Sequence, residues 1–383
     1  MKSLLVSVLV LVVLFISLSC NESYDYSQAA LGLGLRDYSC TEAWIEVQIG
    51  SNDKTADIYI KKNDEIIKTI RIAQSDSLFY FDSLQPNTVY KFDAVTYEDG
   101  KEVKSNPVTF TTLDTTSHNF TWQTFTFGEH SSSTLYDVAI IDENNIWAVG
   151  EIYMNDSLGN PDTKIYNAIH WNGSVYKSIN TSSFFPALVN KMGGTSNNDF
   201  YIVGTNGQIA HYNGASWSKI ESGTTTNIND IWGVIDQSNN QQMVYGAVSF
   251  VAQTGDQKIL KIQNNKVDSL YWNTARRVHS VWTYNNRYLY AAGGGIFENK
   301  RGYWNEITEV PLYYSRKIRG SGNNDIFVCG DFGLFAHFNG VSWQTYNELY
   351  LQGIYYSLST QNNIVVTVGF EGGKTVILKG TRN

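Results

Sequence analysis

Between residue 36 and about residue 113, hydrophobic and polar residues alternate in short runs that turn-forming residues separate. Alternation with a period of two is typical of strands that bury one face. The runs that we expect to be strands are AWIEVQI, ADIYIKK, EIIKTIRI, LFYFDSL, VYKFDAVTY and PVTFTTL. This segment therefore predicts a small all-β domain.

From residue 118 to residue 383 the alternation is organised into repeats. Each repeat has a strand-like run before an Asn-Asn dipeptide and two more after it, and in the first five repeats a fourth run begins with an aromatic residue. The dipeptide that takes this place in the repeat lies at residues 144, 197, 239, 285, 323 and 362. Repeats of about 40–45 residues with four strands are typical of β-propeller blades, so six copies predict six blades.

The sixth repeat ends at Asn383 without a fourth strand. FTWQTF at residues 120–125 closely matches SWQTY at residues 342–346, the fourth strand of the fifth repeat. We therefore expect residues 120–125 to complete the last blade, which removes an exposed sheet edge. The predicted fold is all-β, with a sandwich followed by a six-bladed β-propeller closed by this N-terminal strand.

Two stretches resemble known families. Leu84, Pro86, Thr88 and Tyr90 in LQPNTVYKFDAV match the L-x-P-x-T-x-Y corner of fibronectin type III domains. That resemblance implies a sandwich over residues 36–113, with the tyrosine hydroxyl bonded back to the backbone. The repeat D-[IF]-[YF]-x-[VC]-G-x-x-G-x-[IF]-A-H-[YF]-N-G-x-S-W over residues 118–383 resembles that of secreted bacterial propellers, which are distant relatives of the sialidase and kelch-like propellers.

The N-terminus has the features of a secretory signal. Lys2 precedes an almost wholly apolar run from Leu4 to Leu18, and small Ser19 precedes Cys20. This pattern resembles bacterial lipoprotein signals, which implies that residues 1–19 are removed and that Cys20 is acylated. We expect a lipidated tether over residues 20–35 and a cell-envelope location at the outer membrane or cell surface. The alternative, without acylation, is secretion.

The net charge bears on possible partners, and the cysteine positions bear on possible disulfides. The formal net charge is −8, with 36 acidic and 28 basic residues. Nucleic-acid binding requires a dense basic surface, so nucleic acid is not an expected partner. Cys40 and Cys329 lie in different predicted domains, and no disulfide is expected. Cys329 aligns with apolar positions of other repeats, which predicts a buried residue.

His170, His211 and His337 precede an aromatic residue and Asn-Gly in separate repeats. Zinc ligands must converge to about 2 Å from the ion, so equivalent positions on separate blades favour a structural role. Asp156, Asn160 and Asp162 lack the order of a calcium loop, which favours a solvated loop. No metal or cofactor is expected.

In a propeller, the loops that enter each first strand share a face with the loops after each second strand. Aromatic and arginine side chains in these loops suit a sugar, a carboxylate or a protein loop. The candidate ligand-binding residues are Phe184, Phe185, Phe250, Arg276, Arg277, Tyr313, Tyr314, Arg316 and Arg319. The alternative is a solvated rim in which the arginines form ion pairs.

No catalytic motif for acyl transfer, metalloproteolysis or phosphate binding occurs in the sequence. NGASW and NGVSW also lack the start of the S-x-D-x-G-x-x-W box of sialidases. The sequence therefore predicts a non-catalytic envelope lipoprotein that binds a glycan or an envelope protein. A sialidase- or lyase-like carbohydrate-active enzyme and a structural envelope scaffold remain alternatives.

Overall fold

The computed structural model describes residues 31–49, 56–72, 76–98, 100–179, 191–196, 199–236, 240–250, 256–300 and 302–383. Within these ranges the regular elements are strands and two short 3-10 turns, so the all-β prediction is confirmed. No helix of the described residues is long and apolar enough to span a membrane. The chain divides into two compact units, one of residues 31–34, Glu46–Ser77 and Lys91–Val108, the other of Leu35–Ile45, Leu78–Tyr90 and Thr109–Asn383.

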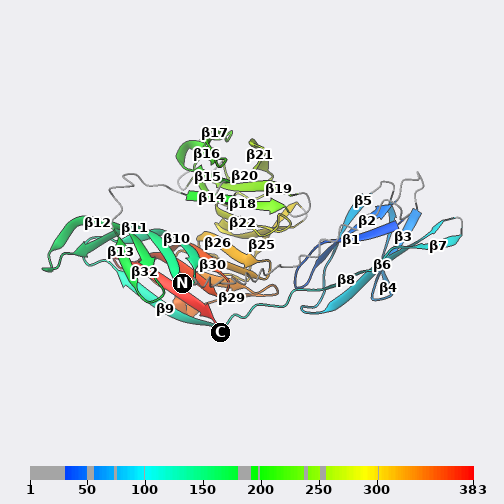
Figure 1. Cartoon of the computed structure of the whole chain (residues 1–383), viewed down its shortest axis with the longest axis horizontal. Helices are drawn as coiled ribbons and strands as arrows, with labels where there is room; N and C mark the ends of the chain where they lie inside the picture. Colours follow the sequence, from blue (N-terminus) through cyan, green and yellow to red (C-terminus); the bar gives the residue numbers. More distant parts are fainter. Residues whose placement is uncertain are drawn as a thin grey trace, which may run out of the picture. The chain divides into compact units, whose positions relative to one another are not determined.

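The N-terminal strands form two sheets (Figure 1). One contains, in order, β1 (Leu31–Tyr38), β2 (Ala43–Ile49) and β5 (Asp76–Phe81). The other contains β4 (Glu65–Ile72), β3 (Ala56–Lys62), β6 (Val89–Glu98) and β7 (Lys101–Lys104), and β8 (Val108–Thr111) also pairs with β6. The backbone N–H of Gln85 donates a hydrogen bond to the Tyr90 hydroxyl at 2.9 Å, as expected for the tyrosine corner.

Strand β1 corrects one prediction. It begins at Leu31, inside the segment that the sequence predicted to be a tether to residue 35. Leu31 and Leu33 are both buried, and the glycines between and after them gave no polar alternation to detect. The sheet partner β2, rather than local pattern, accounts for this strand.

The remaining described strands form six sheets of four antiparallel strands each (Figure 1). The first three sheets contain β10 (Thr134–Asp142), β11 (Asn145–Asn155), β12 (Pro161–Trp171), β13 (Tyr176–Ile179); β14 (Lys191–Ser196), β15 (Asp199–Val203), β16 (Gln208–Tyr212), β17 (Trp217–Glu221); and β18 (Ile228–Asp236), β19 (Gln241–Val248), β20 (Lys258–Gln263), β21 (Lys266–Leu270). The next two contain β22 (Val278–Thr283), β23 (Leu289–Gly293), β24 (Gly295–Lys300), β25 (Tyr303–Ile307); and β26 (Ser315–Gly322), β27 (Asp325–Gly330), β28 (Phe335–Phe338), β29 (Trp343–Thr345). Four-stranded antiparallel sheets in chain order are the blades of a β-propeller.

The sixth sheet joins the two ends of this region. Its order is β30 (Ile354–Gln361), β31 (Ile364–Glu371), β32 (Lys374–Arg382) and β9 (Phe120–Phe127). Strand β9 pairs with β32 from Phe120 opposite Arg382 to Phe127 opposite Thr375. The segment predicted at residues 120–125 is therefore the outer strand of this sheet.

The core lies between neighbouring sheets. Their first strands contact one another in the spatial order β10, β30, β26, β22, β18 and β14. Cys329 is fully buried and packs with Phe327, Phe335, Tyr355 and Leu358. The prediction of a core role for Cys329 is thus confirmed. Burying each large apolar side chain of this kind contributes about 1.5–3 kcal/mol to folding.

The repeated histidines have a structural role. The Nε2 atoms of His211 and His337 lie 2.9 Å from an Oδ1 atom of Asp199 and Asp325 respectively. His170 makes the equivalent bond to the Asn145 amide oxygen at 2.9 Å. Each ring also stacks on an aromatic residue of the second strand, with centroids 4.2–4.4 Å apart. In these three sheets, the contacts join the third strand to the start of the second.

Candidate functional site

Five first strands of the described chain carry a β-bulge near their start. The pairing register between first and second strand skips one residue in β10, β18, β22, β26 and β30. The skipped residues, which we call the bulge row, are Tyr136, Asn229, His279, Arg316 and Tyr356. A bulge leaves one residue outside the hydrogen-bond ladder and re-aims its side chain, often beside a functional site.

Side chains of the bulge row contact one another across sheets. The rings of Tyr136 and Tyr356 have centroids 5.9 Å apart. The guanidinium carbon of Arg316 lies 5.8 Å from the Tyr356 ring centre and 4.7 Å from that of Tyr314. Tyr314 in turn meets His279 with centroids 5.7 Å apart. A continuous surface of aromatic and cationic groups therefore runs from β10 to β22.

The Arg316 guanidinium is held in one orientation. Its Nε donates to Asp331 Oδ1 at 2.7 Å, and its Nη2 donates to Asp331 Oδ2 at 3.3 Å. Asp331 follows β27, and its backbone N–H donates to the Tyr314 carbonyl at 2.9 Å. A bidentate pair of this geometry fixes the plane of the guanidinium, which leaves its faces to the tyrosine rings.

A cluster of exposed aromatic residues adjoins this pair. Tyr313 contacts Phe332 and Tyr350 with centroids 5.4 and 6.0 Å apart and interplanar angles of 55° and 76°. Phe332 is 61% exposed and has a φ of 60°. That left-handed conformation is uncommon for a bulky residue and costs about 1–3 kcal/mol. The fold therefore holds an apolar side chain in solvent despite backbone strain.

The structure brings some of the predicted face residues together. Tyr313, Tyr314 and Arg316 belong to the surface just described. Burial raises the pKa of Tyr314, and the positive charges of Arg316 and Arg277 act against that rise. Arg277 is half-buried, and its guanidinium forms no ion pair with any residue that the structure describes.

Other predicted residues lie elsewhere or are otherwise engaged. Arg276 pairs with Glu306 at 2.9 Å and donates to the Gly294 carbonyl at 2.9 Å, as in the alternative of intra-rim ion pairs. Phe250 follows β19 and is exposed. Phe184 and Phe185 lie outside the described residues.

Arg319 is a buried residue and not part of the exposed face. It is 8% exposed, and its Nη2 donates to Asp230 Oδ1 at 2.7 Å. Lys317 Nζ donates to the same carboxylate oxygen at 2.8 Å, and the Ser280 hydroxyl donates to the other. Burial alone would raise the pKa of Asp230, but the charges of Arg319 and Lys317 hold that pKa far below its usual range. These contacts connect β18, β22 and β26.

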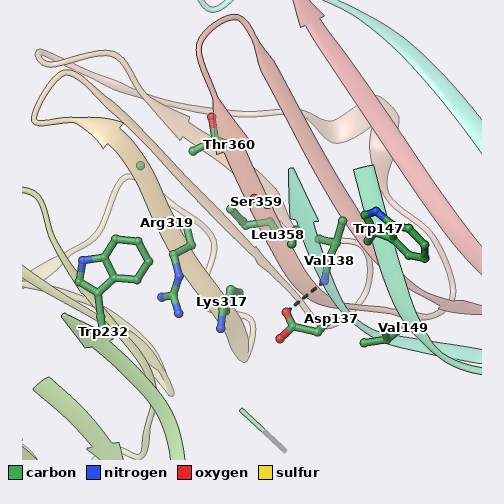
Figure 2. A pocket seen from close by; sticks show the side chains of 12 residues that line it. Asp137, Val138, Trp147, Val149, Trp232, Lys317, Arg319, Leu358, Ser359 and Thr360 are labelled. Carbon is green, nitrogen blue, oxygen red and sulfur yellow. Dashed lines mark hydrogen bonds between the residues drawn. The ribbon is translucent and has the colours of Figure 1, made fainter. Parts of the chain in front are cut away.

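A cavity of about 310 Å³ lies against this buried cluster (Figure 2). Lys317, Arg319 and Trp232 line it together with Asp137, whose carboxylate accepts a hydrogen bond from Ser357. The Arg319 guanidinium carbon lies 4.7 Å from the Trp232 ring centre. Four donor contacts of Arg319 Nη1 go to Asp230, Ser280 and the Ile318 and Val281 carbonyls, so this arginine stabilises the inner strands.

The sequence carried a signal for the residues that were missed. Aligned by repeat, five first strands have LYD, IND, VHS, SRK and YYS at their start or one residue after it, so that the bulge row occupies the middle column. Each middle residue is polar or aromatic and the following one is Asp, Ser or Lys, which departs from the alternation of a plain strand. Phe332 and Tyr350 had no such signal.

No protein-family model matches the chain, and no curated protein matches it. A solved structure of YCF48 bound to D1 peptide is 13% identical, with a TM-score of 0.48, over 70% of this chain and 100% of that one. YCF48 from Cyanidioschyzon merolae is 13% identical, with a TM-score of 0.44, over 67% and 98%. The WD40 β-propeller domain of Doa1 is 15% identical, with a TM-score of 0.40, over 68% and 97%. These similarities are too distant to carry an argument about function.

Proposed function

We propose that this chain is a non-catalytic binding module whose partner contacts the bulge row and the adjacent aromatic cluster. The observation that carries the proposal is the grouping of exposed Tyr313, Phe332 and Tyr350 beside the fixed Arg316. Exposed apolar patches mark interaction sites, and tyrosine and arginine side chains are frequent anchors of such sites.

The ionisable groups of this surface favour binding over turnover. Burial raises the pKa of both Tyr136 and Tyr314, so that both hydroxyls stay protonated at neutral pH. The Asp331 carboxylate is engaged by Arg316 through both oxygens. A general acid or base works best with a pKa near the operating pH and with access to its substrate.

The proposal includes the architecture and the location. The six sheets close as a six-bladed propeller, residues 31–113 form a fibronectin type III-like spacer, and acylated Cys20 anchors the chain to the cell envelope. The pairing of β9 with β32 and the hydrogen bond of the Tyr90 hydroxyl support the first two parts. The lipoprotein-like sequence around Cys20 supports the third.

The test is site-specific photo-crosslinking in cells that express the full-length chain. A photoreactive phenylalanine analogue is placed at Phe332 or Tyr350, and as a matched control at Tyr271, which is 77% exposed next to the outer strand β21. We expect a discrete covalent adduct from the first two positions and none from the control. Equal adducts from all three positions, or none from the first two, would contradict the proposal. Turnover of fluorogenic glycosides would instead identify an enzyme.

A further inference from the structure

We propose that the bulge row and Arg277 receive an acidic peptide segment, either a loop or a terminus of a partner protein. This inference rests on the proposed function and narrows its partner to a polypeptide with a carboxylate at the point of contact.

The polar groups of the surface are poorly placed for a sugar. Recognition of sugar hydroxyls needs amide and carboxylate groups with free hydrogen-bonding capacity. The Asn229 amide nitrogen already donates to the Ser249 carbonyl and hydroxyl at 2.8 and 3.1 Å. Both Asp331 oxygens accept from Arg316. The Tyr313 ring is inclined at 55° to the Phe332 ring and at 76° to the Tyr350 ring, so the three rings form no shared flat platform for a sugar ring.

The composition of the surface matches the centre of a protein interface. Tyrosine, phenylalanine, arginine, histidine and asparagine make up the bulge row and the aromatic cluster, and lysine and glutamate are absent from both sets. Aromatic residues and arginine are enriched at interface centres, where lysine and glutamate are depleted. Inclined rings form pockets between them, which suit branched or aromatic side chains of a peptide.

Arg277 and Arg316 add two positive charges to this surface of an acidic chain, and Asp331 neutralises one of them. Arg277 lies two residues before His279, whose ring centroid is 5.7 Å from that of Tyr314. The Arg316 guanidinium carbon lies 4.7 Å from the same Tyr314 ring, so both arginines belong to one part of the surface. Asp331 balances Arg316 at 2.7 Å, whereas Arg277 has no ion pair among the described residues. A half-buried guanidinium without an ion pair among the residues that the structure describes is well suited to a carboxylate, which it can bind through two parallel hydrogen bonds.

The experiment pans a random-peptide display library on the full-length chain in detergent micelles. Enriched peptides are synthesised, together with versions in which Asp and Glu are replaced by Asn and Gln. Their affinities are measured for the wild type, Arg277→Gln, Tyr356→Ala and the control Arg71→Gln, an exposed arginine of β4. We expect enriched peptides with acidic residues, a loss of about tenfold or more for the neutral peptides and for Arg277→Gln, and no change for Arg71→Gln.

The outcomes separate this inference from the proposed function. Enriched peptides without acidic residues, or an affinity that Arg277→Gln leaves unchanged, would overturn the inference. A second result would also overturn the inference: no peptide is enriched, and the chain instead binds a glycan array saturably in a way that Tyr356→Ala abolishes. The proposed binding module would still stand in that case. No adduct in the crosslinking experiment and no peptide or glycan binding would overturn both. Circular dichroism of each variant checks that the fold is retained.

Discussion

Asp230 is a carboxylate that is almost without exposed surface and that faces two cations, Lys317 and Arg319. Replacing one partner of a buried ion pair costs about 3–5 kcal/mol, because the remaining charges stay buried without compensation. We therefore expect Asp230→Asn to lower the free energy of unfolding by about that amount in urea denaturation. Glu221→Gln, which removes an exposed ion pair with Lys219, is the control and should change it by about 0.5 kcal/mol at most. Similar losses of unfolding free energy for both variants would show that the buried Asp230 cluster stabilises the fold no more than an exposed ion pair does.

The strained backbone at Phe332 should lower the stability of the fold, whereas its exposed side chain should strengthen partner binding. Glycine adopts a φ of 60° without strain, so Phe332→Gly should raise the free energy of unfolding by up to about 1 kcal/mol while it weakens partner binding. Asn362→Gly, at a φ of 54°, is the control, since asparagine already tolerates this conformation. Thermal unfolding and the crosslinking yield at Tyr350 measure the two effects. A destabilised Phe332→Gly variant would show that the side chain packs for the fold instead.

At the scale of single residues, the sequence was enough to choose candidate side chains, but it could not show which neighbours surround them in the fold. Loop position and type sufficed to select Tyr313, Tyr314 and Arg316. They could not show that Arg319 lies four residues into β26, where Asp230 of a sheet distant in sequence reaches it. That contact depends on how first strands pack side by side, which local alternation does not encode.

Among the elements, the β9–β32 pair is the one whose loss has the clearest expected result. The Trp122 ring lies over Gly380, so that a Cβ atom there would collide with it. We expect Gly380→Val to destabilise the fold by about 1–3 kcal/mol, because the ring is also held against Phe335 and Tyr346. Thr381→Val, on the exposed side of the same strand, should be nearly neutral in the same urea titration. Equal stability of both variants would show that β32 can shift away from β9.

The segment before β9 also predicts how stability depends on pH. His118 Nδ1 lies 2.8 Å from His337 Nδ1, and burial, with the charges of His337 and Arg382, lowers the pKa of His118 to about 4. An unfolded histidine titrates near its usual pKa of 6.5, so the unfolded chain binds more protons between pH 6.5 and 4. The stability is therefore fully present above pH 6.5 and falls as the pH drops toward 4.

Urea unfolding at a series of pH values tests this dependence. His118→Asn should show a smaller loss of stability between pH 6.5 and 4 than the wild type, because the variant removes one group with a depressed pKa. The pKa of His337 is lowered as well, so part of the slope remains in the variant. Parallel curves for the two proteins would contradict the assignment to His118.

Strand existence was predicted well, because the repeats supply several copies of the same alternation. The pairing of β9 was predicted from the similarity of FTWQTF to SWQTY, two segments more than 200 residues apart. Strand β1 was missed because its glycines carry no pattern, and the bulges were missed because a single skipped residue resembles noise in one strand. Only the alignment of five first strands makes the bulge column visible.

For the molecule as a whole, the proposed lipid anchor at Cys20 is the feature to test. Cys20→Ser should abolish incorporation of a radiolabelled fatty acid and move the chain from the detergent phase to the aqueous phase in detergent partitioning. Cys40→Ser is the control and should keep the label, since Cys40 is a free, buried cysteine. Label retained in Cys20→Ser would show that acylation occurs elsewhere or that the anchor is of another kind.

The repeated bulges have a consequence for how this protein can change over time. Each bulge residue lies outside the ladder that joins its strand to the next, so its side chain is released from the demands of pairing. Tyrosine, asparagine, histidine, arginine and tyrosine already share the same place on five strands without altering the sheets. A lineage can therefore exchange these residues one at a time and acquire a new partner, while the blades that present them are inherited intact.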